Sequence, residues 1–126
     1  VFVLAQPVFL LEMWGAFFRL YGERHGALAT PVMRGVMPLQ SHRHTEFLYN
    51  EVPGIRPTEA IRERMRLAGS DGRREGVRIS QELILEGRDE VHGVDSMPSF
   101  HRYEVASEVL EAIGDRRLTA QLPSNT

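Results

Sequence analysis

Three short polar segments of this 126-residue sequence carry most of the side chains that could bind a small molecule. They are residues 6–9, 38–44 and 97–102, and each sets polar side chains beside prolines and aromatic rings. Each follows a run of strand type, and parallel α/β folds bind ligands at the carboxyl ends of their strands. The pattern indicates one site shared by three loops, although prolines and polar residues also end strands for purely structural reasons.

Two side chains in these loops suit ligand recognition. Gln6 ends an apolar strand-like run, and its neutral amide can pair with a donor and an acceptor on the edge of a heterocycle. Arg102 can hold a carboxylate or phosphate with its guanidinium fork. An arginine at the start of a helix is also an ordinary surface residue, so this second assignment has a structural alternative.

The histidines raise the question of a metal site. His42 and His44 are expected at a helix start, where residues two apart do not face each other, and no third ligand stands at a familiar spacing. We therefore expect no metal and assign this pair to a polar site wall or to capping. The isolated histidines His25, His92 and His101 are expected to be satisfied surface or core residues.

Missing residue types and motifs exclude several mechanisms. The chain has no cysteine, and all 15 basic residues are arginine, which removes thiol, disulfide, Schiff-base and P-loop lysine chemistry. The net charge of −2 lacks the basic excess typical of nucleic-acid binders. No nucleophile elbow or dinucleotide fingerprint occurs, and the glutamates fall on expected helix faces rather than in a catalytic pair.

Strands alternating with helices must position these loops. Strand-like runs cover residues 1–5, 30–37 and 91–97, and the first is expected to be buried on both faces. Helical periodicity predicts helices over 10–23, 42–49, 59–67, 70–86 and 102–113. Ser41 and Thr58 are expected to cap two of them, and the apolar helix 10–23 to pack against other layers. The alternation predicts an α/β fold with a parallel sheet, and no apolar run is long enough to span a membrane.

Five stretches of the chain resemble methylenetetrahydrofolate reductase. They are LAQPVF at 4–9, VMRGVMPL at 32–39, HRHTEFL at 42–48, NEVPGI at 50–55 and MPSFHRYE at 97–104. The similarity runs over about residues 1–114 and is most specific over 35–54. It is nearest to the form in bacterial bifunctional homocysteine S-methyltransferase/methylenetetrahydrofolate reductases.

The resemblance implies a TIM (β/α)8 barrel with FAD at the carboxyl ends of its strands. This chain would supply part of that barrel, about its last three βα units. The family reduces 5,10-methylenetetrahydrofolate to 5-methyltetrahydrofolate with electrons from NAD(P)H through FAD, a step of one-carbon metabolism and methionine biosynthesis. Whether NADH or NADPH serves, and whether a methyltransferase domain precedes the barrel, is left open.

By the same resemblance, folate contacts fall on Gln6, His44, Leu48 and Arg102. His44 stands where many members have Gln, and Leu48 where some place an aromatic ring against the substrate. No catalytic or FAD-binding residue is assigned, because the assisting acid and most FAD contacts lie earlier in the family's barrel. Leu10 departs from the pattern, since many members have Asp there.

We expect residues 1–114 to be the C-terminal segment of such a barrel and residues 115–126 to be a polar tail. The sequence opens without Met in a strand-like run, which indicates a fragment with no turnover of its own. No signal peptide pattern is present, so a cytoplasmic protein is expected. Open sheet edges would favour oligomers. The alternative is a stand-alone, non-enzymatic α/β module that binds a small molecule or associates with itself.

Overall fold

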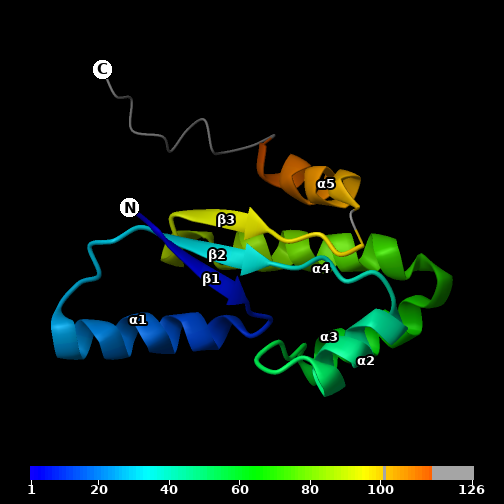
Figure 1. Ribbon diagram of the computed structural model, residues 1–126, viewed down its shortest axis with the longest axis horizontal. Coiled ribbons are helices and arrows are strands. Elements are labelled where there is room, and N and C mark those ends of the chain that lie inside the picture. The colour runs from blue at the N-terminus through cyan, green and yellow to red at the C-terminus, as the bar shows by residue number, and fades with distance from the viewer. Residues whose placement is uncertain (101, 115–126) are drawn as a thin grey trace.

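The computed structural model describes residues 1–100 and 102–114, which form a three-stranded parallel sheet with helices around it (Figure 1). The strands are β1 (Val3–Pro7), β2 (Val32–Val36) and β3 (Gly93–Ser96), paired in the order β1-β2-β3. Both pairs are parallel. The predicted α/β class and parallel sheet are confirmed. The expected tail at 115–126 and His101 lie outside the described residues.

Five α-helices connect or follow the strands, close to the predicted ranges. They are α1 (Leu11–His25), α2 (His42–Glu51), α3 (Glu59–Ala68), α4 (Gly72–Glu86) and α5 (Tyr103–Gly114), with 3-10 turns at Gly69–Asp71 and Arg88–Glu90. Both predicted caps are present. The Ser41 hydroxyl accepts from the His44 N–H at 3.0 Å, and the Thr58 hydroxyl accepts from the Ile61 N–H at 3.3 Å.

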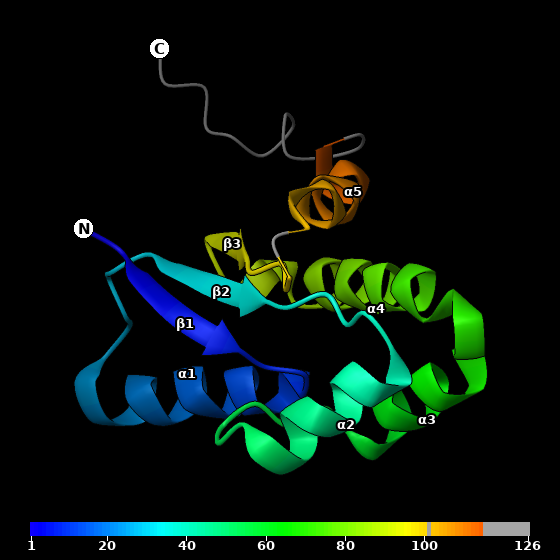
Figure 2. The ribbon, with the colours of Figure 1, turned by 45° about the vertical axis from the view of Figure 1, so that its right-hand side comes forward.

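The core consists of two apolar clusters on either side of α4. The first joins α2, α3 and α4 beyond the strand ends and contains Phe9, Leu39, Leu48, Ile61, Met65 and Ile79. The second joins the sheet to α4 and α5 and contains Val36, Val77, Ile84, Val105 and Val109. Figure 2 shows α4 running beside β2 and β3, with α2 and α3 beyond their carboxyl ends. The first cluster therefore holds the loop that follows β2, because Leu39 in that loop is one of its members.

Two expectations about burial are wrong. The first strand is not buried on both faces, because β1 is an edge of the sheet and Leu4 is 57% exposed. Helix α1 buries Trp14 but leaves Met13 and Phe17 exposed, so it does not pack its whole apolar surface against other layers. The rings pack on one another instead, with Trp14 stacked on Phe18 at 5.9 Å. In the described part of the chain, nothing covers this side.

A β-bulge lies in β1 next to Gln6. The register runs Leu4 to Met33 and then Pro7 to Gly35, so two residues of β1 face one residue of β2. Gly35 makes this possible, since a Cβ there would lie 2.5 Å from the Ala5 carbonyl oxygen. Bulges re-aim side chains and are frequent beside binding sites. The bulge therefore determines the position of Gln6 at the end of β1.

Candidate functional site at the strand ends

Three loops meet at the carboxyl ends of the strands, as the sequence predicts. In Figure 1, β1 and β2 point toward α2 and α3, and the segment after β3 continues past the same end of the sheet. The second loop rests on α4. A Cβ at Gly72 would lie 3.1 Å from the Ser41 Cα, and one at Gly76 would overlap the Leu39 carbonyl oxygen. Two glycines therefore let the loop pack directly on the helix backbone.

His44 joins the loop after β2 to the loop after β3. Its side chain is buried, and its Nδ1 accepts the Gln40 N–H at 3.1 Å. Its Nε2 lies 3.3 Å from the Ser99 Oγ, and its ring centroid is 5.4 Å from that of Phe100. Burial lowers the pKa of His44 below its ordinary 6.5, so the imidazole is neutral at pH 7.

Gln6 lies beneath the loop that follows α2. A Cβ at Gly54 would lie 3.4 Å from the Gln6 Oε1, and Gly54 has a φ of +84°, a conformation that favours glycine. The Gln6 residue is exposed, which leaves its amide accessible at the end of β1. Its pairing with a heterocycle edge stays a prediction.

The turn that leads into α5 brings Arg102 near Ser99. The Arg102 N–H donates to the Ser99 carbonyl oxygen at 3.3 Å, and Arg102 itself is exposed. Within this turn Phe100 has a φ of +59° and is 68% exposed. A left-handed conformation is uncommon for an aromatic residue, and such outliers cluster at binding sites. The structure therefore places a guanidinium, a hydroxyl and an exposed ring in one turn.

Leu48 occupies a different position from the other predicted site residues. It is 4% exposed and packs in the first core cluster with Phe9 and Leu39. The structure gives it a packing role in holding α2, and its contact with folate stays a prediction.

Three residues have roles that the sequence reasoning missed. Ser99 and Phe100 contact His44 across a long separation in the chain, which no local pattern signals. Arg34, in the middle of β2, is 1% exposed, and its Nη2 donates to the Leu83 carbonyl oxygen near the end of α4. The Leu83 carbonyl oxygen also accepts the Gly87 N–H at 3.2 Å, so Arg34 adds a second, charge-assisted hydrogen bond to it. A buried cation near a helix C-terminus also complements the helix dipole.

The other histidines have structural positions. His92 extends the pairing of β2 with β3, because its Nδ1 accepts the Val32 N–H at 3.1 Å and its own N–H donates to the Val32 oxygen at 2.9 Å. This confirms the prediction of a satisfied histidine. His25 is exposed at the end of α1 beside Tyr21. Among residues 1–100 and 102–114, no group of three or more His, Asp or Glu side chains could hold a metal ion.

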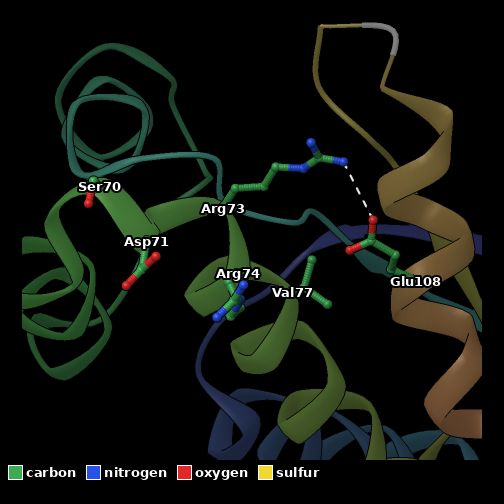
Figure 3. Close-up of a pocket in the computed structure, with 6 residues that line it drawn as sticks. All are labelled: Ser70, Asp71, Arg73, Arg74, Val77 and Glu108. Atoms are coloured by element: carbon green, nitrogen blue, oxygen red, sulfur yellow. Dashed lines mark hydrogen bonds and ion pairs between the residues drawn. The ribbon is translucent and has the colours of Figure 1, made fainter.

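A separate cavity of about 320 Å³ lies between the start of α4 and α5 (Figure 3). Its lining residues are Ser70, Asp71, Arg73, Arg74, Val77 and Glu108. The Arg73 Nη2 reaches across it to the Glu108 Oε1 at 3.5 Å and to the Glu104 Oε1 at 3.4 Å. Opposite charges already face each other here, and none of the predicted folate contacts lines it, so the strand ends are the better candidate.

None of the helices described in residues 1–114 has the length and apolar character needed to cross a membrane. No protein-family model and no curated protein matches this chain.

Proposed function

We propose that this chain forms part of the folate pocket of a methylenetetrahydrofolate reductase-like flavoenzyme, as about the last three βα units of its barrel. The observation that carries the proposal is the contact between His44 and Ser99, which joins two of the strand-end loops named by the resemblance. The third such loop contributes Gln6, whose amide is accessible. The strand order β1-β2-β3, with every pair parallel, is what consecutive units of a barrel require.

Within this proposal each site residue has a role that its chemistry supports. The Gln6 amide offers one donor and one acceptor to the pterin edge, and the Arg102 guanidinium offers a fork to a carboxylate of folate. His44 shapes the wall between them. These residues bind and orient the substrate, and none of them performs the redox step.

FAD is a poor fit to the cavities of this chain. The cavity beside α5 and a second one along α3 and α4 are both lined by charged side chains, which do not suit an apolar isoalloxazine ring. The flavin, which takes electrons from NAD(P)H, would then be held by other parts of such an enzyme. We therefore expect the chain alone, mixed with NADH, FAD and methylenetetrahydrofolate, to show no NADH oxidation; turnover would overturn this expectation.

Binding of 5-methyltetrahydrofolate tests the proposal directly. We expect a titration followed by amide NMR signals to move those of Gln6, Gly54 and Ser99 and to leave Gly22 on α1 unchanged. Arg102→Ala should weaken binding about tenfold, as expected for loss of a charge-assisted contact. The control is Arg19→Ala, an exposed arginine on α1 that should bind like the wild type. No localised shifts at the strand ends, or equal loss in both variants, would contradict the proposal.

A second candidate function rests on a different surface. Large apolar side chains are exposed at the start of the chain and on α1. Phe2, just before β1, is 60% exposed and Leu4, in β1, is 57% exposed. On α1, Met13 is 58% exposed and Phe17 is 48% exposed. On α1 the Phe17 ring lies against the rings of Trp14 and Phe18, and exposed apolar clusters mark interaction surfaces. Strand β1 also presents an unpaired edge within the described sheet. This favours a module that associates with itself, which is tested by its oligomeric state in solution.

A further inference from the structure

The hydrogen bonds of His44 fix which of its nitrogens carries the proton. A backbone N–H can only donate, so the bond from the Gln40 N–H at 3.1 Å requires a lone pair on the His44 Nδ1. The single proton of a neutral imidazole must then lie on Nε2. The low pKa that burial gives His44 keeps the ring in this neutral form at pH 7.

The proton on Nε2 in turn makes the Ser99 hydroxyl an acceptor and turns its own proton away from His44. The two groups are 3.3 Å apart, so Nε2–H donates and the Ser99 Oγ accepts. The proton of Ser99 cannot point back at a nitrogen that already carries one. Ser99 is half-buried at the carboxyl end of β3, where the other strand-end loops also meet.

We propose that Ser99 is a specificity-determining hydrogen-bond donor, oriented by His44 toward an acceptor atom of a planar heterocyclic ligand at the strand ends. Phe100 supplies the argument for a planar ring, since this exposed side chain is held beside His44 at 5.4 Å in a left-handed conformation. Aromatic faces stack on flat heterocycles. With the proposed function, on which the ligand's identity rests, the acceptor is a carbonyl oxygen or ring nitrogen of the pterin.

The same geometry excludes the other common role of a serine beside a histidine. A nucleophilic serine needs an imidazole nitrogen with a free lone pair to take its proton. Here the lone pair is on Nδ1 and is occupied by Gln40, so His44 cannot serve as the base for Ser99. His44 and Ser99 therefore serve ligand recognition. Ser99 should show no activity toward activated esters.

The free chain tests the first half of the inference without any ligand. We expect the imidazole ¹⁵N signals of His44 to report a protonated Nε2 and an unprotonated Nδ1 at neutral pH. A proton on Nδ1, a charged ring, or hydrolysis of p-nitrophenyl acetate that Ser99→Ala abolishes would each overturn it.

The second half is tested by the affinity for 5-methyltetrahydrofolate. Ser99→Ala should weaken binding about fivefold, the loss expected for one hydrogen bond, while Ser99→Thr keeps the hydroxyl and should bind within about twofold of the wild type. Amide NMR spectra of both variants confirm that the fold is intact. Equal affinity for Ser99→Ala and wild type overturns the role of Ser99 and leaves the proposed function standing. Absence of binding by the wild type overturns the proposed function and the ligand assignment together, and the tautomer result then stands alone.

Discussion

The Nε2 of His44 and the Oγ of Ser99 lie 3.3 Å apart although the two residues are separated by 55 positions in the sequence. The contact crosses from the first turn of α2 to the loop after β3, and so links two of the three strand-end loops. The sequence predicts that His44 forms part of a polar site wall. In the structure it also connects the start of α2 to the loop that follows β3. Protonation of His44 would add a proton to Nδ1, so the ring would lose its hydrogen bond from the Gln40 N–H.

The stability of the chain should fall as the pH drops below about 6.5. Burial lowers the pKa of His44 in the folded state, whereas the unfolded chain keeps the ordinary 6.5. The unfolded state then binds more protons below pH 6.5, so the free energy of unfolding declines by at most about 1.4 kcal/mol per pH unit until the folded pKa is reached. Urea unfolding at a series of pH values between about 8 and 5 measures this decline.

The matched variants for this measurement are His44→Gln and His25→Gln. The first should flatten the pH dependence, because glutamine does not titrate. The second replaces an exposed histidine at the end of α1 and should leave the dependence unchanged. A decline in His44→Gln as steep as that of the wild type would assign the effect to other groups.

Gly76→Ala should destabilise the fold, whereas Gly22→Ala should stabilise it. A Cβ at Gly76 would overlap the Leu39 carbonyl oxygen, and the backbone of a packed loop must then move, at a cost of about 1–3 kcal/mol. Gly22 lies in α1 with no atom within 4 Å of an added Cβ, so alanine there gains about 0.5–1 kcal/mol from helix propensity. Thermal or urea unfolding compares the two. Equal effects of the same sign would show that the loop does not rest on α4 as described.

Local sequence features predict the elements well and their surroundings less well. Helical spacing and the hydroxyls of Ser41 and Thr58 locate α2 and α3 to within two residues, because capping is a contact between near neighbours. The wrong predictions concern the burial of α1 and β1. An apolar face in a sequence indicates a surface that favours burial, but it does not show whether another part of the chain covers that surface. Burial depends on partners distant in sequence.

Some residues of the candidate site could likewise be predicted from the sequence, and others could not. Gln6 and Arg102 could be selected because strand ends are visible in the sequence and ligands gather there. The partners of His44 could not, because the contacts with Ser99 and Phe100 form only when β3 pairs beside β2. Arg34 reads as a polar residue in a strand, and its burial against Leu83 likewise depends on how α4 lies on the sheet.

Arg64→Ala should lower the free energy of unfolding by about 1 kcal/mol, an amount that allows for screening by solvent. The Arg64 guanidinium on α3 contacts the Glu82 Oε2 at 2.6 Å and the Glu75 Oε1 at 2.7 Å on α4. The control is Arg66→Ala, whose partner Glu63 lies on the same exposed face of α3, and which should change stability little. Urea unfolding at neutral pH compares the two.

Acid should remove the contribution of Arg64. Its hydrogen bonds hold the pKa of Glu82 below the ordinary 4.5, so this stabilisation is present above pH 4.5 and is lost as the pH falls through the lowered pKa. The difference between wild type and Arg64→Ala should therefore shrink toward zero in acid. A difference that stays constant would show that Arg64 acts through packing of its stem rather than through its charge.

The exposed side formed by β1 and α1 should make the chain associate with itself. Met13 and Phe17 are more than two-fifths exposed, and burying such groups against a second surface is favourable by about 25 cal/mol per Å². Phe17→Glu would place an unpaired charge in that contact, so sedimentation equilibrium should show a lower average mass for this variant than for the wild type. Phe47→Glu is the control, because Phe47 is similarly exposed but lies on α2. A wild-type monomer at every concentration would reject association, and an equal effect of both substitutions would place the contact elsewhere.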